Sequence, residues 1–221
     1  QGLKKANILG ACDDSLRRLG VDAIDLYQSH RDDAETSVEE TMEAFAVLVK
    51  AGKVRALGAS NFAPDRLKAS LAFSAKNGLP RYETLQPLYN LYDRAGFEGP
   101  LQELCAQEGV SLIPYYGLAA GFLTGKYRVA ADLKQSVRGS RIEASYLNPR
   151  GLKILAAMDQ VAAASGATLA QISLAWLMTR QTIAAPIASA TSLVQFEELL
   201  GALTLSLSPA HLAALDAAST P

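Results

Sequence analysis

The sequence predicts an α/β fold in which a parallel sheet is covered by helices on its outer side. Short apolar segments alternate with longer segments of helical periodicity, as in proteins built from strand–helix units. The first three apolar segments begin about 30 residues apart, which is the length of one such unit. They are short and apolar, which is typical of strands buried on both faces in a barrel or a doubly wound sheet. Five strands are expected, at 23–30, 54–61, 84–91, 111–116 and 183–190.

The helices expected between these strands have recognisable ends. Thr36 is the expected cap of a helix over 37–51, and Gly52 is its expected stop. Pro64 stands at the first position of a helix over 65–76, where its fixed φ and missing N–H are tolerated. The other expected helices cover 4–19, 98–108, 149–165, 168–180, 192–201 and 209–218.

One segment, 115–147, interrupts this alternation. It is rich in Gly, Arg, Ser and Lys, and we expect a long loop there, which in compact domains is usually functional. The glycine fingerprint GxGxxG follows none of the expected strands, which disfavours a Rossmann domain. Because linker composition and internal repeats are also absent, residues 1–221 are expected to form a single domain.

Composition excludes several classes of function. Apolar residues make up 49% of the chain and the formal net charge is −1, which does not suggest a nucleic-acid-binding surface. No apolar run approaches the roughly 18 residues of a membrane helix. Cys12 and Cys105 form neither a metal motif nor a disulfide framework. We therefore expect a cytoplasmic protein without metal, membrane or nucleic-acid partners.

Polar and aromatic side chains gather where the expected strands end. In parallel α/β proteins the functional site lies at the carboxyl ends of the strands. The groups expected there are 28–30, 59–61, Gln86, 115–117 and 189–191. An imidazole such as His30 can donate a hydrogen bond to a carbonyl oxygen or exchange a proton near neutral pH. A structural histidine at a turn is the alternative for this position.

Four segments resemble successive signatures of one enzyme family. They are SLRRLGVDAIDLYQSHRDD, GKVRALGASNF, QPLYNLYDR and IPYYGLAAGFLTGKY. In order and spacing they resemble the aldo/keto reductase family, in particular its bacterial members and the potassium-channel beta-subunits, over essentially the whole chain. The resemblance implies a (β/α)8 TIM barrel that binds NADPH without a Rossmann motif. The strands of this chain would correspond to strands 4–8.

The resemblance also implies roles for individual residues. His30 would be the catalytic histidine that orients the substrate carbonyl, while Ser60, Asn61 and Gln86 would contact the nicotinamide carboxamide. Tyr115 would stack on the nicotinamide ring, with core packing as the alternative. The residues implied around the pyrophosphate are Tyr116, Gly117, Leu118, Ala120, Gly121 and Lys126.

The adenosine end of the cofactor would be held by later segments. Arg141 matches a family arginine near the adenosine phosphate, with an ordinary surface arginine as the alternative. The residues that match the adenosine pocket are Ser189, Thr191, Gln195 and Glu198. The chain departs from the family where Ser189 replaces a usual Gly, Leu199 a usual Asn, and Tyr116-Gly117 a usual Ser-Pro. The preference for NADPH over NADH therefore stays open.

The family's proton donor has no matching position in this sequence. The family uses a tyrosine, a lysine and an aspartate from its second and third strands, and Tyr27, Tyr89 and Tyr92 lie in other motifs. We expect a fragment, although a truncated gene product or a barrel completed by another chain would have the same sequence.

Three functional hypotheses follow for the whole protein. It is an NADPH-dependent reductase of a small-molecule carbonyl, a non-catalytic NADP(H)-binding regulatory subunit, or an inactive homologue. An unrelated α/β barrel would leave the ordered motifs unexplained. The chain alone is expected to bind part of NADPH without reducing a carbonyl, and the sequence indicates neither the substrate nor the oligomeric state.

Overall fold

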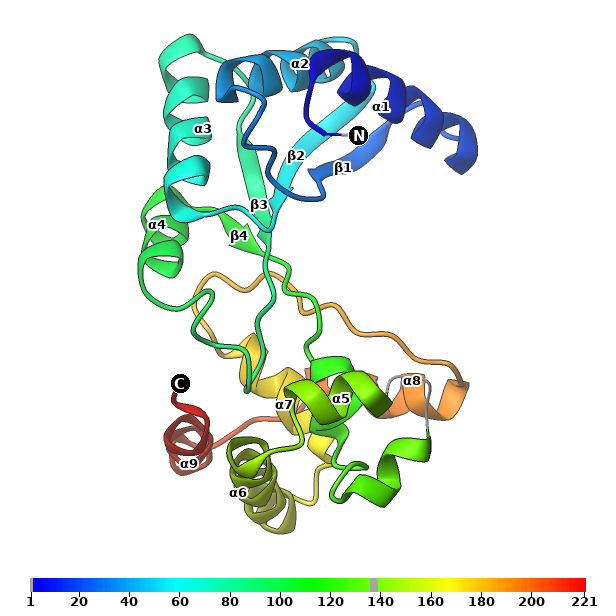
Figure 1. The fold of residues 1–221 in the computed structure, drawn as a ribbon, viewed down its shortest axis with the longest axis vertical. Coiled ribbons are helices and arrows are strands. Elements are labelled where there is room, and N and C mark those ends of the chain that lie inside the picture. Colours follow the sequence, from blue (N-terminus) through cyan, green and yellow to red (C-terminus); the bar gives the residue numbers. More distant parts are fainter. Residues whose placement is uncertain (1, 136–138) are drawn as a thin grey trace. The chain divides into compact units, whose positions relative to one another are not determined.

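The computed structural model describes residues 2–135 and 139–221, which divide into two compact units (Figure 1). Unit 1 consists of Gln1–Pro87 and Gly99–Leu112. Unit 2 consists of Leu88–Glu98 and Ile113–Pro221.

Unit 1 is a parallel sheet with helices between its strands, as the sequence predicts. Its strand order is β1-β2-β3-β4, with β1 at one edge. The strands are β1 (Ile24–Ser29), β2 (Val54–Ser60), β3 (Tyr82–Gln86) and β4 (Ser111–Leu112). The helices are α1 (Lys5–Leu19), α2 (Val38–Lys50), α3 (Pro64–Asn77) and α4 (Pro100–Glu108). The predicted α/β class with a parallel sheet is therefore confirmed.

Aromatic rings join the sheet of unit 1 to its helices. Phe45 of α2 packs edge-to-face on Tyr27 and Tyr82, with ring centroids 6.1 and 6.0 Å apart. The buried hydroxyls of Tyr82 and Ser29 also share a hydrogen bond of 2.9 Å. Burial raises the pKa of Tyr82 well above its usual range, so that hydroxyl stays protonated.

The opposite face of the sheet carries a row of residues in register, Gln28, Gly58 and Thr84. An irregularity between Leu57 and Gly58 shifts the register with β3, as a β-bulge does. A Cβ at Gly58 would collide with Thr84 Oγ1 and would lie 2.9 Å from Gln28 Cγ. Glycine is required there because the neighbouring side chains fill the space above it.

Unit 2 is helical and packs around the buried helix α7. Capping explains where its longer helices begin: Asn148 accepts from Gly151 N, and Thr168 forms a capping box with Gln171. Its elements are η1 (Ala119–Thr124), η2 (Ala130–Gln135), α5 (Gly139–Ser145), α6 (Pro149–Ser165), α7 (Leu169–Met178), α8 (Leu193–Leu200), η3 (Gly201–Leu203) and α9 (Pro209–Ser219). Among the described residues no single helix is long and apolar enough to cross a membrane, although α6 and α7 together, across a 96° bend, have the required length and composition.

Two strand predictions are too long and one is wrong. The strand expected over 84–91 occupies Tyr82–Gln86, and the strand expected over 111–116 is reduced to Ser111–Leu112. Beyond them, Leu88 and Tyr115 form an isolated bridge. The segment 183–190 is not a strand: Pro186 has no N–H to donate, and Ile187 N donates to Pro114 O without a ladder around it.

Two further expectations are corrected by local hydrogen bonds and turns. The segment 115–147 is not one long loop, because the short helical elements η1, η2 and α5 lie within it. The cap of α2 is Ser37, whose side chain accepts from Glu40 N. The neighbouring Thr36 instead donates its hydroxyl to Asp33 Oδ2 at 2.7 Å. Gly52 ends this helix with a φ of 72°, as expected.

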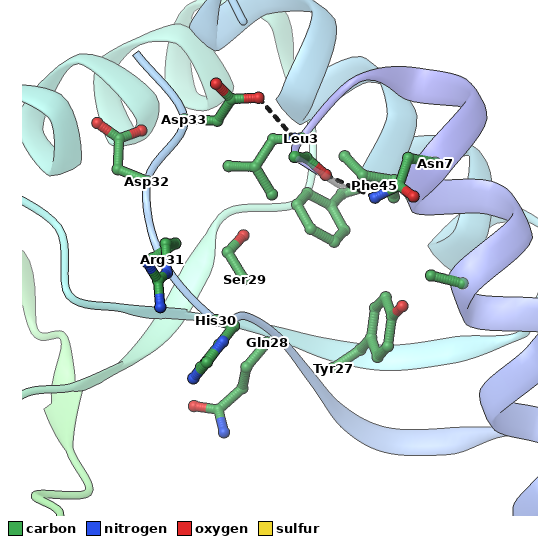
Figure 2. Close-up of a pocket in the computed structure, with 13 residues that line it drawn as sticks. Leu3, Asn7, Tyr27, Gln28, Ser29, His30, Arg31, Asp32, Asp33 and Phe45 are labelled. Carbon is green, nitrogen blue, oxygen red and sulfur yellow. Dashed lines mark hydrogen bonds between the residues drawn. The ribbon is translucent and has the colours of Figure 1, made fainter. Parts of the chain in front are cut away.

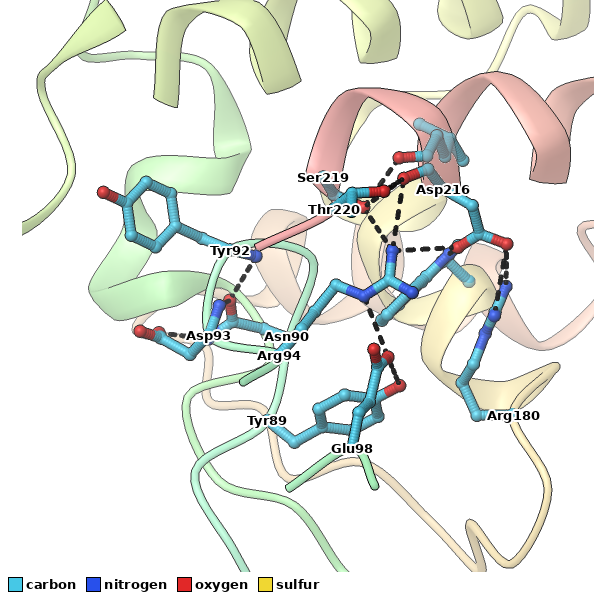
Figure 3. A network of polar contacts seen from close by, with 12 residues as sticks. Tyr89, Asn90, Tyr92, Asp93, Arg94, Glu98, Arg180, Asp216, Ser219 and Thr220 are labelled. Atoms are coloured by element: carbon cyan, nitrogen blue, oxygen red, sulfur yellow. Dashed lines mark hydrogen bonds and ion pairs between the residues drawn. The ribbon is translucent and has the colours of Figure 1, made fainter. Parts of the chain in front are cut away.

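A polar network attaches α9 to the centre of unit 2 (Figure 3). Asp216 accepts hydrogen bonds from Trp176 Nε1 at 3.0 Å, from Arg94 Nη1 at 3.2 Å and from Arg180 Nη2 at 3.2 Å. The guanidinium of Arg180 also lies 4.3 Å from the centre of the Trp176 ring, a cation–π distance. Arg94 is shared with Glu98, whose carboxylate accepts from Arg94 Nε and from the Tyr89 hydroxyl. Asp216 therefore pairs with two largely buried arginines, of which Arg94 is also paired with Glu98.

We expect Asp216→Ala to lower the free energy of unfolding by about 2 kcal/mol, because it leaves partly buried donors without their acceptor. The urea midpoint can be followed through the fluorescence of Trp176, the single tryptophan of the chain. Asp159→Ala is the matched control, because it removes an exposed ion pair. The side chain of Asp159 is 48% exposed and that of its partner Arg128 is 37% exposed. Its expected cost is about 0.5 kcal/mol or less. Equal losses in the two variants would contradict the role of the network.

Candidate functional site

The carboxyl ends of β1, β2 and β3 bring four of the predicted residues together in unit 1. Asn61 Nδ2 donates to the His30 carbonyl at 3.1 Å and to Ser60 Oγ at 3.0 Å. Ser60 Oγ in turn donates to the Gln86 carbonyl at 2.8 Å. One continuous chain of hydrogen bonds therefore links the ends of three neighbouring strands.

The backbone at Asn61 explains how this chain forms. Its φ is 55°, in the left-handed region that Asn adopts more readily than most residues, and this turns its side chain back over β1 and β2. Ser60 is buried, whereas His30 is exposed and Gln86 is partly exposed. His30, Asn61 and Gln86 are therefore the residues of this edge that a bound molecule can reach, since Asn61 is exposed as well.

A cavity of about 590 Å³ lies beside His30, between the start of α1 and the end of β1 (Figure 2). It runs along the edge of β1 that pairs with no strand in the described structure. Gln28 and His30 point to one side of the strand and Ser29 to the other. This cavity therefore follows the open edge of the sheet around to both of its faces.

Asp33 lines this cavity near the segment that leads into α1. Its carboxylate accepts from Leu3 N at 2.9 Å, from the Thr36 hydroxyl at 2.7 Å and from Glu35 N at 3.2 Å. These bonds, with the Leu3 bond contributing most, hold the pKa of Asp33 below its usual value. The ionised carboxylate thus fixes the segment that leads into α1.

The second group of predicted residues lies in unit 2, around a turn with an unusual backbone. Tyr116, Ala119 and Ala120 have φ values of 57°, 47° and 56°, and Gly121 has 98°. Left-handed residues beside right-handed ones make a nest, in which successive N–H groups converge on one point. The N–H groups of Gly117 and Leu118 have no hydrogen-bond partner among the described residues. Gly117 is buried against α7 and Leu118 is partly buried, so these two N–H groups are backbone donors without a partner among the described residues.

Side chains around this turn supply a positive charge and close packing. A Cβ built at Gly121 would lie 3.9 Å from Lys126 Nζ, so an ammonium group stands beside the turn. A Cβ at Gly117 would instead lie 3.1 Å from Leu174 and Leu177, so glycine is needed there for close packing on α7. Tyr115 and Tyr116 pack edge-to-face at 5.2 Å, both partly buried. Leu118 is partly buried and Ala120 buried.

The residues predicted for the adenosine pocket lie in and before α8. Gln195 Oε1 accepts from Thr191 N at 2.8 Å and from Thr191 Oγ1 at 3.0 Å, and Ser192 caps the helix. The carbonyl of Glu198 accepts from Gln171 Nε2 at 3.0 Å. Ser189, Thr191 and Gln195 are exposed. Arg141 belongs to α5, and its side chain lies outside the described part of the chain.

Two buried polar residues near this turn were not singled out from the sequence. Asn90 and Ser173 are both fully buried, and their side chains donate to the carbonyls of Tyr116 and Gly117. A signal exists for Ser173, which is a lone hydroxyl in the apolar helical run LAQISLAWLM. Asn90 lies within the QPLYNLYDR segment, but its residue type does not distinguish it there, because a polar residue after a strand is usually in a turn. Among the described residues, no group of three or more His, Cys, Asp or Glu side chains is placed to hold a metal ion.

Comparisons with known proteins agree on one family. The sequence model of the Aldo/keto reductase family matches residues 1–220. L-glyceraldehyde 3-phosphate reductase of Escherichia coli (strain K12) is 30% identical, over 97% of this chain and 64% of its own length. Protein tas of the same organism is 33% identical, over 98% and 68%. Aldo-keto reductase yakc [NADP(+)] of Schizosaccharomyces pombe is 31% identical, over 90% and 58%. The chain thus spans less than two thirds of the length of L-glyceraldehyde 3-phosphate reductase.

We expect Asp33→Asn to lower the urea midpoint of the protein at neutral pH, measured by far-UV circular dichroism. The pKa of Asp33 is lower in the folded than in the unfolded state, so its ionised form stabilises the fold above the unfolded pKa of about 3.9. That stability is lost as the pH falls through the folded pKa. The difference from the wild type should therefore be largest above about pH 5 and should vanish in strong acid. Asp25→Asn makes the same charge change on the exposed surface of β1, and an equal effect there would contradict the prediction.

Proposed function

The chain belongs to the aldo/keto reductase family, and on this basis we propose that the whole protein reduces aldehydes or ketones to alcohols with NADPH. The observation that carries the proposal is the hydrogen-bonded chain from His30 through Asn61 and Ser60 to Gln86. It lies at the carboxyl ends of parallel strands, where barrel enzymes of this architecture keep their active sites. The proposed substrate is a small carbonyl compound, and the proposed compartment is the cytoplasm.

We also propose that the fold of the whole protein is the (β/α)8 barrel of the family. In that barrel β1 to β4 would be the fourth to seventh strands, and the segment 183–190 would follow the path of the eighth. The open edge of β1 supports this arrangement, because an unpaired strand edge needs a neighbour or a cover. The cavity beside His30 lies along this same edge.

The residues present have the chemistry that NADPH needs. The carboxamide of Gln86 can both donate and accept, as the nicotinamide carboxamide requires. Asn61 Nδ2 donates to Ser60 Oγ, which donates to the backbone carbonyl of Gln86. The N–H groups of Gly117 and Leu118, with the ammonium of Lys126 near them, suit a pyrophosphate. The adenosine end would meet the segment from Ser189 through Thr191 and Gln195 to Glu198, with Arg141 near its phosphate. When bound, NADPH supplies a hydride from its nicotinamide ring.

The chain's own contribution to catalysis is the exposed imidazole of His30. At the end of β1 it can donate a hydrogen bond to a carbonyl oxygen and so set the orientation of the substrate. Tyr89 is not a proton donor for this site, because burial and the bond to Glu98 raise its pKa and hold its hydroxyl in unit 2's polar network. We propose that these 221 residues alone bind NADPH without turnover, since the tyrosine, lysine and aspartate of the family have no matching positions here.

We expect His30→Ala in the full-length protein to lower kcat/KM for an aldehyde by roughly 100-fold or more, while the Kd for NADPH changes less than about twofold. Turnover is measured through NADPH absorbance over a panel of aldehydes and ketones. His211→Gln is the matched control, because His211 is the other histidine and lies on α9. Its kinetics should equal those of the wild type.

The outcomes separate the functional hypotheses. A full-length protein that binds NADPH but turns over no carbonyl would overturn the reductase proposal and favour a regulatory NADP(H)-binding subunit. A full-length protein that binds no NADPH would overturn both. Fluorescence titration of the 221-residue chain with NADPH tests the proposal that this chain alone binds the cofactor.

A further inference from the structure

We propose that Asn90 and Ser173 are positioning residues for the pyrophosphate of NADPH. They hold two consecutive carbonyl groups so that the next two backbone N–H groups stay directed at the anion. This inference rests on the proposed function and goes beyond it, because neither residue would touch the cofactor.

Asn90 is fully buried and uses its whole hydrogen-bonding capacity. Its Oδ1 accepts from Tyr92 N at 2.8 Å and from Asp93 N at 2.9 Å, which makes a local Asx turn. Its Nδ2 donates to Asp93 Oδ2 at 2.8 Å and to the Tyr116 carbonyl at 2.9 Å. The Tyr146 hydroxyl donates to the same Asp93 oxygen at 2.9 Å. The bond to Tyr116 therefore comes from a side chain that its neighbours hold in one orientation.

Ser173 makes the equivalent bond from the other side. A serine inside a helix usually donates its hydroxyl to the carbonyl four residues earlier. Ser173 instead donates to the carbonyl of Gly117 at 2.8 Å, 56 residues away in the sequence. It is fully buried, and Gly117 has no Cβ that would push the turn away from Leu174 and Leu177 beside it. The close packing of the turn on α7 makes this bond possible.

The two bonds determine where the free donors point. The carbonyl of Tyr116 and the N–H of Gly117 belong to one planar trans peptide, in which the two groups point in opposite directions. The same holds for the Gly117 carbonyl and the Leu118 N–H. Because Asn90 and Ser173 draw both carbonyls toward the interior, both N–H groups are directed away from it. These are the two N–H groups that have no partner among the described residues.

The positive φ of Tyr116 shows that this orientation has a cost. A non-glycine residue at a φ of 57° is strained relative to the extended and helical regions, and such residues persist where surrounding contacts enforce them. Asn90 and Ser173 are the side chains that supply these contacts at its carbonyl and at the next one. The Tyr116 carbonyl also accepts from Ala119 N at 2.7 Å, so Asn90 reinforces a turn that already restrains this peptide, while Ser173 holds the next one.

The test uses the full-length protein and a graded series at position 173. Cysteine keeps the volume of serine with a weak donor, and alanine removes the donor. Isothermal titration calorimetry compares NADPH with adenosine 2′-monophosphate, which carries neither phosphate of the pyrophosphate. We expect the Kd for NADPH to rise roughly three- to tenfold in Ser173→Ala, the factor of one neutral hydrogen bond, and to be intermediate in Ser173→Cys. The Kd for adenosine 2′-monophosphate should change less than about twofold.

A second variant tests the other residue. Asn90→Ser keeps a hydroxyl that can accept from the backbone of the turn, as serine does in such turns, but it is too short to reach the Tyr116 carbonyl. Asn90→Ser should raise the Kd for NADPH and leave the Kd for the nucleotide without the pyrophosphate unchanged. Ser70→Ala is the control, because the buried Ser70 donates only within its own helix, to the Arg66 carbonyl at 2.9 Å. It should lower the melting temperature without changing either Kd.

Several results would overturn the inference. It fails if Ser173→Ala binds NADPH as tightly as Ser70→Ala, or if both ligands lose affinity equally, since that would indicate a general loss of structure. If Ser173→Ala does not fold, the near-isosteric Ser173→Cys and Asn90→Ser decide the question alone. A wild-type protein that binds no NADPH shows a different failure, that of the proposed function, and it is recognised before any variant is made.

Discussion

The planar peptide bond is the constraint on which the candidate cofactor turn depends. A carbonyl that is held by a buried side chain also sets the direction of the N–H on the far side of the same peptide. In unit 2, Asn90 and Ser173 hold two such carbonyls in succession. Both side chains that hold these carbonyls are uncharged, and Asn90 is itself held in place by the Asp93 carboxylate.

Local signals allowed most of the fold to be predicted. Pro64, Pro149 and Pro209 each open a helix, and the sequence periodicity locates β1 and β2 to within one residue. Strand length was less predictable, because a strand lasts only as long as its neighbour supplies a ladder. The apolar segment 183–190 has the composition of a strand, yet Pro186 interrupts its donors and no described strand pairs along it. Pairing partners are a property of the fold and not of the segment.

The candidate site divides in a similar way. Residues in recognisable motifs, such as His30, Ser60 and Gln86, could be named from the sequence, and the structure joins them through Asn61. The supporting residues could not be named, because their roles depend on contacts over long sequence separations. In the sequence, Ser173 is one small residue within an apolar helix. Its role becomes apparent only from its hydrogen bond to the turn at Gly117. Chemistry at the surface of a site leaves a motif, whereas the groups that hold it in place leave little trace.

The row formed by Gln28, Gly58 and Thr84 has a consequence for how this protein can vary among its descendants. A methyl group at position 58 would meet Thr84 Oγ1 and Gln28 Cγ at once, so no single substitution there is accommodated by moving one neighbour. A larger residue at position 58 therefore requires smaller side chains at positions 28 and 84. The dependence runs one way, because Gln28 and Thr84 can each become smaller while Gly58 is kept.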